Sequence, residues 1–167
     1  MKLTKKETQM NLWTAHFWLT REVVTDATYG IPCLNEDLAA LYQNQKDLGH
    51  NFGELTKNRE AGEKLAHLLK EHIRIAVEIV QAAIAGKDIL NLYAEWKYNA
   101  SEIAETYHKY NKKLKYKEMN KMMQEHLSTT LNEAVAIITK ECKESRERGD
   151  IALEHIIHMA DYINSKF

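Results

Sequence analysis

Hydrophobic residues recur every three or four positions along most of this chain, which is the spacing of an apolar stripe on an α-helix. The clearest stripe lies within residues 65–83 and is made of Leu65, Leu68, Leu69, Ile75, Ala76, Ile79 and Ala83. Similar stripes predict helices over residues 4–27, 36–52, 59–85, 88–104, 117–147 and 150–166. We therefore expect helix to account for nearly all regular structure.

Turn signals divide these stripes. Gly30 and Pro32 end the first helix, Asn58 is placed to cap the third, and Arg148-Gly149-Asp150 is expected to break or kink the last long stripe. Residues 107–116 form the expected connection before the fifth helix. One Pro and six Gly leave little material for the many turns of a strand-rich fold. The prediction is an all-α protein with a four-helix-bundle-like core, one or two additional helices, and a single domain over residues 1–167.

Composition and charge limit the expected binding partners and cellular location of the protein. The formal net charge is −1, which gives no general attraction to nucleic acid or to an anionic membrane. The Lys- and Tyr-rich segment from Lys109 to Lys117 could contact RNA, but a solvated connection between helices is the favoured interpretation. No apolar run reaches membrane-spanning length, and two distant cysteines do not make a disulfide framework. We expect a cytoplasmic protein.

Four histidines interrupt the apolar stripes of four different predicted helices: His16, His72, His126 and His155. A buried imidazole needs a partner for its ring nitrogens, because an unpaired buried polar atom costs about 1–3 kcal/mol. Four imidazoles that meet in one core therefore require either a polar network or a bound ligand. A single histidine on an apolar face is more often a core residue with its hydrogen bonds satisfied. The hypothesis of a ligand site therefore depends on the occurrence of such histidines on four helices.

Other polar residues share these stripes and complete two rival hypotheses. In the first, a transition metal ion (Fe, Zn, Mn or Cu) or a small ligand binds the four histidines, with Glu71, Glu133 and Asp47 as carboxylate ligands. Asn44, Asn99 and Thr130 would then support the site. In the alternative, the protein is a non-catalytic scaffold or interaction protein, such as a homodimer, whose polar core is fully satisfied. No phosphate-binding loop or nucleophile motif is present, so whether the chain is an enzyme stays open.

Segments spread over nearly the whole chain carry a family resemblance. They are Trp13-x-x-His16-x-Trp18-x-Thr20-Arg21, Asn44-Gln45-x-Asp47-x-Gly49, Leu69-Lys70-Glu71-His72-Ile73, Trp96-x-x-Asn99-Ala100-x-x-Ile103-Ala104, His126-Leu127 followed by Thr129 or Thr130, Glu133-Ala134 and Met159-Ala160-Asp161. With them the chain resembles a family of small bacterial and archaeal all-helical proteins without an established activity. Labels such as glycosyltransferase or acetylglutamate kinase imply nucleotide-binding α/β folds, whose strands and Gly-rich loops this sequence lacks. The resemblance implies a helical domain and the same polar positions, but no mechanism.

Overall fold

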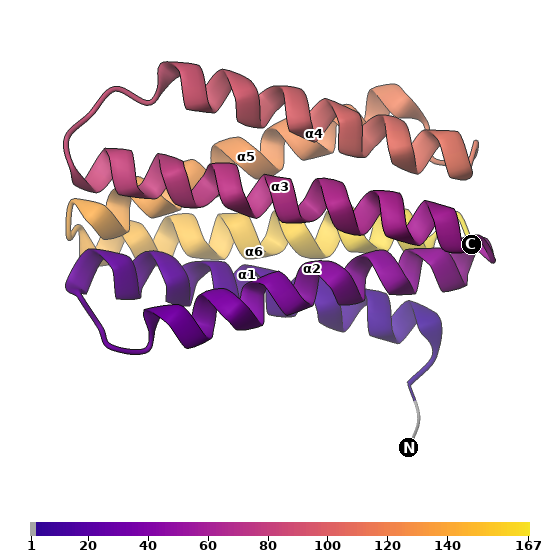
Figure 1. Cartoon of the computed structure of the whole chain (residues 1–167), viewed down its shortest axis with the longest axis horizontal. Helices are drawn as coiled ribbons and strands as arrows, with labels where there is room; N and C mark the ends of the chain where they lie inside the picture. The colour runs from indigo at the N-terminus through magenta and orange to yellow at the C-terminus, as the bar shows by residue number, and fades with distance from the viewer. Residues whose placement is uncertain (1–2) are drawn as a thin grey trace.

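The computed structural model describes residues 3–167, and within them the chain forms six α-helices and no β-strand (Figure 1). The helices are α1 (Lys5–Tyr29), α2 (Leu34–Thr56), α3 (Arg59–Ile84), α4 (Leu90–Tyr110), α5 (Tyr116–Ile138) and α6 (Cys142–Asn164). The predicted all-α class and bundle core are confirmed. The helices are of similar length, between 21 and 26 residues, so all six contribute to the core.

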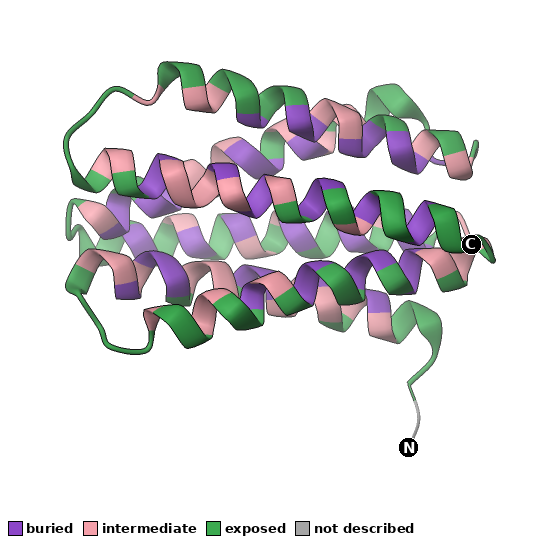
Figure 2. Cartoon of the chain, in the orientation of Figure 1, coloured by how far each residue is buried: buried purple, intermediate pink, exposed green. Residues whose placement is uncertain are grey.

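The six helices form a closed ring of three αα-hairpins, which are α1–α2, α3–α4 and α5–α6. Each helix packs against the next one along the chain, and α6 returns to pack against α1. The odd-numbered helices α1, α3 and α5 also contact one another. They therefore line the centre of the bundle, while α2, α4 and α6 pack into the grooves between them. Buried positions run as stripes along the inward faces of the helices (Figure 2).

Most of the predicted helix ends are confirmed, but one predicted break is wrong. Gly30 ends α1 with a φ of 67°, and the Asn58 side chain accepts a hydrogen bond from the Ala61 N–H. The break expected at residues 148–150 lies instead between Ile138 and Cys142, where Lys140 has a φ of 61°. Residues 148–150 belong to α6.

Gly149 is required by packing and not by a turn. A Cβ atom at this position would lie 2.7 Å from Arg21 Nη1 and 2.9 Å from Glu133 Oε1. The glycine therefore leaves room for the ion pair between those two side chains. Gly49 is likewise required by packing: its Cβ would lie 2.5 Å from Ala66 Cβ, so α2 and α3 are in very close contact.

One further expectation is corrected by the structure. The connection predicted to begin at Tyr107 begins only after Tyr110, and Tyr107 is a fully buried residue of α4. Cys33 and Cys142 are both exposed, and both thiols are free. None of the helices within residues 3–167 has the length and apolarity needed to cross a membrane.

Candidate functional site

Three of the four predicted imidazoles lie beside one another at the centre of the bundle. His16, His72 and His126 come from the middle of α1, α3 and α5, and each is at most 3% exposed. The ring centroid of His126 lies 5.5 Å from that of His16 and 5.7 Å from that of His72. The apolar stripe of each odd-numbered helix places its histidine on the inward face, so the three side chains meet where those helices meet.

Burial keeps these three imidazoles neutral at pH 7. Loss of hydration, together with the smaller effect of the nearby His72, lowers the pKa of His16 to about 3. Burial also lowers the pKa of His72 to about 4, although its hydrogen bond to Asn99 opposes the shift. The pKa of His126 is held well below its usual value by burial and by the neighbouring histidines. The group therefore offers lone pairs and N–H donors but no charge.

The hydrogen bond with Asn99 fixes the tautomer of His72. Asn99 Nδ2 donates to the Leu68 carbonyl at 3.1 Å, so its Oδ1 is the atom that lies 2.8 Å from His72 Nδ1. Since Oδ1 can only accept, His72 Nδ1 carries the proton. His72 Nε2 is then a buried acceptor, and it has no hydrogen-bond partner among the described residues.

His16 has the opposite tautomer. Gln45 Nε2 contacts the Leu41 carbonyl at 2.9 Å and Asn44 Oδ1 at 3.0 Å, and both of these atoms are acceptors. The same Gln45 nitrogen lies 3.2 Å from His16 Nδ1. An amide nitrogen cannot accept a hydrogen bond, so Nδ1 is the acceptor in this contact and shares one of the two amide hydrogens with the other acceptors. The His16 proton consequently sits on Nε2.

One polar contact recurs in all three hairpins. In each hairpin a side chain of the even-numbered helix contacts a backbone carbonyl of the odd-numbered helix, four residues before the buried histidine. The contacts are Asn44 Nδ2 to the Leu12 carbonyl (2.9 Å), Asn99 Nδ2 to the Leu68 carbonyl (3.1 Å) and His155 Nε2 to the Met122 carbonyl (2.9 Å). His155 is thus the counterpart of the two asparagines, and its Nε2 is the donor.

The pattern of buried residues around each central histidine also repeats from hairpin to hairpin. The residue three positions before each central histidine is buried, as is the residue that follows it: Trp13, Leu69 and Met123, then Phe17, Ile73 and Leu127. Successive copies lie about 55 residues apart. The bundle is therefore a threefold repeat of αα-hairpins, with His16, His72 and His126 in equivalent positions. Our sequence reasoning missed this repeat, although the equal spacing of these histidines and of Asn44, Asn99 and His155 was a visible signal.

The carboxylates predicted beside the histidines lie elsewhere. Asp47 is exposed on α2 and accepts a hydrogen bond from Gln43, so it does not face the core. Glu71 is half-exposed and pairs with Arg74 at 2.9 Å. Their positions one residue away from the buried stripe explain the difference, because adjacent helical residues point about 100° apart. These two predicted ligand positions do not belong to the central site.

Glu133 is buried, as predicted, but it is committed to an ion pair. Its carboxylate binds Arg21 of α1, and the same guanidinium donates to the Ser145 carbonyl of α6 at 3.1 Å. Burial raises the pKa of Glu133, whereas Arg21 opposes that shift. The pair therefore connects three helices.

Metal ligation by these residues stays a prediction. Within residues 3–167 no group of three or more His, Cys, Asp or Glu side chains is arranged to hold a metal ion. The His72 and His126 rings are stacked with an angle of 20° between their planes. A metal ion lies close to the plane of each imidazole that binds it, so these nearly parallel rings could share an ion only if one of them turned.

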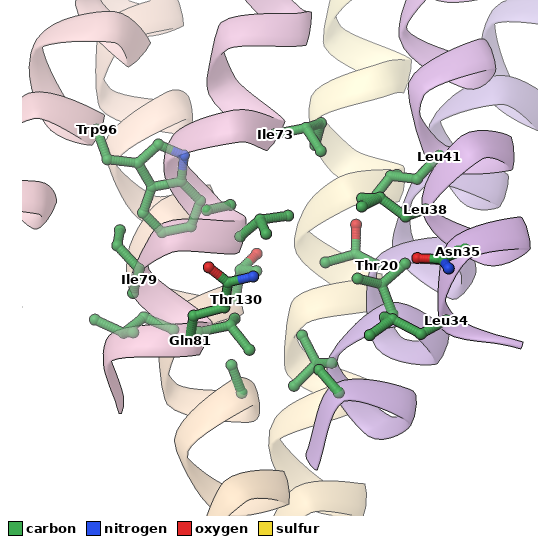
Figure 3. A pocket seen from close by; sticks show the side chains of 18 residues that line it. Thr20, Leu34, Asn35, Leu38, Leu41, Ile73, Ile79, Gln81, Trp96 and Thr130 are labelled. Carbon is green, nitrogen blue, oxygen red and sulfur yellow. The ribbon is translucent and has the colours of Figure 1, made fainter. Parts of the chain in front are cut away.

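An apolar cavity of about 150 Å³ lies where α1, α2, α3, α4 and α5 meet (Figure 3). Its wall includes residues of two small apolar clusters, each separate from the main core: Val24, Val80 and Ala134 belong to one, and Val23, Leu41 and Ile73 to the other. The side chains of α1, α2, α3 and α5, with Trp96 of α4, therefore leave a gap in the packing here.

Trp96 and Thr130 belong both to the cavity wall and to the histidine site. Trp96 donates its indole N–H to the His72 carbonyl at 3.0 Å, and its ring centroid lies 5.0 Å from that of His72. The Thr130 hydroxyl lies 3.3 Å from His126 Nδ1. Two side chains thus connect the apolar space to the neutral imidazoles.

Comparison with known proteins does not assign the chain to a family or suggest a function. No protein-family model matches the chain, and no curated protein or solved structure is significantly similar to it. The chemistry of the site must therefore be read from the contacts, burial and shape of the chain itself.

Proposed function

We propose that this protein binds a small, mainly apolar molecule in the cavity beside the three central imidazoles. The observation that carries the proposal is the cavity of about 150 Å³, lined mainly by aliphatic side chains where five helices meet. Its lining also includes the exposed residues Asn35 and Gln81, so the cavity opens to solvent and a ligand can enter it. Concave, mainly apolar walls with a few polar groups are typical of small-molecule sites, and apolar spaces of comparable volume accept benzene or xenon.

The neutrality of the site restricts the ligand. The pKa values of His16 and His72 are lowered by burial to about 3 and about 4, so neither ring supplies a positive charge at pH 7. A charged ligand would lose its hydration without gaining a counter-ion. The proposal is therefore limited to uncharged molecules with a compact hydrocarbon body.

Benzene is the probe that tests the proposal. We expect benzene to raise the melting temperature and to shift amide resonances around the cavity in ¹H–¹⁵N spectra, together with the Trp96 indole resonance. In the variant Ala134→Leu the added carbons fill the cavity, so both effects should disappear while the helical circular dichroism is retained. Ala39→Leu makes the same change on the exposed face of α2 and should respond as the wild type does.

Two outcomes would contradict the proposal. One is the absence of any response of the wild type to saturating benzene. The other is an equal response in Ala134→Leu, which would place the binding outside this cavity. The first result favours the alternative of a polar core that binds no ligand.

A transition metal ion is the second candidate, because His72 Nε2 presents a lone pair without a partner. Elemental analysis of tag-free protein, with melting curves measured before and after chelation, tests it. Bound metal that is lost in His72→Ala would support it, whereas metal-free protein with an unchanged melting temperature would contradict it.

A cytoplasmic location is supported by the two free, exposed thiols, which fit a reducing compartment.

A further inference from the structure

Thr130 differs from the other threonines within the helices of the described chain. All of the others donate their hydroxyl to the backbone carbonyl four residues earlier: Thr8, Thr14, Thr20, Thr25, Thr28, Thr56, Thr106 and Thr129. The Thr130 hydroxyl instead lies 3.3 Å from His126 Nδ1. Its neighbour Thr129 shows the ordinary arrangement at the next position of the same helix, so the local helix geometry does not cause the difference.

The Thr130 hydroxyl keeps hydrogen-bonding capacity for a molecule in the cavity. If His126 Nδ1 accepts, the hydroxyl donates to it and retains free lone pairs. If His126 Nδ1 carries the proton, the hydroxyl accepts from it and retains a free O–H. An imidazole can change between these tautomers without a change of charge. The threonine can thus present either a donor or an acceptor to a ligand.

We propose that the ligand of this cavity is a small neutral alcohol or phenol whose hydroxyl binds Thr130. The inference rests on the proposed function, because it needs the cavity to hold a ligand. A hydroxyl group is both a donor and an acceptor, so it can pair with Thr130 in either tautomer of His126. A carbonyl, which can only accept, pairs with Thr130 in only one of them. An aliphatic amine is charged at pH 7, so the uncharged surroundings of the cavity exclude it. The aliphatic walls formed by Val23, Val77 and Ala134 would hold the hydrocarbon body.

Phenol and benzene form a matched pair of probes, because they differ by a single hydroxyl. In an entirely apolar cavity phenol binds more weakly than benzene, since its hydroxyl loses water without gaining a partner. With Thr130 as partner we expect phenol to bind at least as tightly as benzene. In Thr130→Val, which keeps the shape but removes the hydroxyl, the preference for phenol should fall about tenfold. Dissociation constants from isothermal titration calorimetry or NMR titration give this ratio.

Two variants serve as controls. Thr130→Ser keeps the hydroxyl and should keep the preference for phenol, whereas Thr129→Val makes the same change one residue away and should leave the ratio unaltered. If benzene binds but Thr130→Val and the wild type show the same ratio, the alcohol assignment is overturned and the cavity proposal stands. If neither probe binds the wild type, the cavity proposal is overturned and the assignment falls with it.

The wild type also provides a readout that needs no variant. Phenol bound to Thr130 changes the hydrogen bonding of His126 Nδ1, so the ¹⁵N resonance of that nitrogen should move with phenol and stay in place with benzene. The ring nitrogens of His67, which is exposed on α3, should not respond to either probe. Equal shifts of the His126 resonance with both probes would contradict a direct role for Thr130.

Discussion

The three central imidazoles should make the protein sensitive to mild acid. In the unfolded chain a histidine has a pKa of about 6.5. In the folded protein burial lowers the pKa of His16 to about 3 and that of His72 to about 4, and His126 lies well below its usual value. Below about pH 6.5 the unfolded chain therefore binds protons at these histidines, whereas the folded chain does not. This contribution to stability is fully present above about pH 6.5 and is lost as the pH falls toward the folded-state values.

The size of the effect follows from the linkage between protonation and unfolding. Each buried neutral imidazole removes about 1.4 kcal/mol from the free energy of unfolding for every pH unit well below 6.5. At pH 5 the loss is about 2 kcal/mol for one ring and about 6 kcal/mol for all three. Domains are typically stable by about 5–15 kcal/mol, so this loss is a large share of the total.

Urea unfolding followed by circular dichroism between pH 5.0 and 8.0 measures this loss. Carboxylates in the unfolded chain titrate mainly below this range, so histidines dominate it. The slope at the acid end should approach three protons. His16→Gln, which stays neutral, should reduce it by about one proton, whereas the exposed control His67→Gln should leave it unchanged. A slope below one proton, or equal effects of the two variants, would refute neutral burial of the three rings.

Three further substitutions test the packing and the repeat by urea unfolding or thermal melting. Gly49→Ala should lower the free energy of unfolding by about 1–3 kcal/mol, because the new Cβ forces α2 and α3 apart; a stabilised variant would contradict the close approach. His155→Asn, which restores the residue found at the equivalent position of the other hairpins, should melt higher than His155→Ala, and the reverse order would argue against their equivalence. Glu133→Gln should cost about 3 kcal/mol by leaving Arg21 without its buried partner. Glu144→Gln, which removes the exposed ion pair between Glu144 and Arg148, should cost less than about 1 kcal/mol, and equal losses would show that burial of the first pair is unimportant.

The helices were predictable from sequence because their signal is local. Apolar spacing alone identified the inward faces, including the positions of His16, His72 and His126. The boundary between α5 and α6 was not predictable by the same reasoning. Gly149 has the local signature of a helix stop, but its absence of a side chain serves an ion pair between residues of two other helices. No local pattern distinguishes a glycine that ends a helix from one that makes room for a neighbour.

The candidate site was predictable only in part, for a similar reason. Spacing on one helix indicates which side chains point inward, but it does not indicate which of them contact each other. The partner of His72 is Asn99, which lies on the next helix. The position of the His72 proton follows from the second hydrogen bond of Asn99, in which its Nδ2 donates to the Leu68 carbonyl. A cavity is still less accessible, because it is the space that side chains of five helices fail to fill.

The closed ring of hairpins also has a consequence for assembly. The junction between α6 and α1 joins an even-numbered helix to the next odd-numbered helix of the ring, as do the junctions between α2 and α3 and between α4 and α5, and it is the least extensive of the three. A chain whose last hairpin detaches therefore exposes a surface that the corresponding hairpin of another molecule fits equally well. Refolding at high protein concentration should consequently produce domain-swapped oligomers, in which each ring is completed by a neighbour and every native contact is retained.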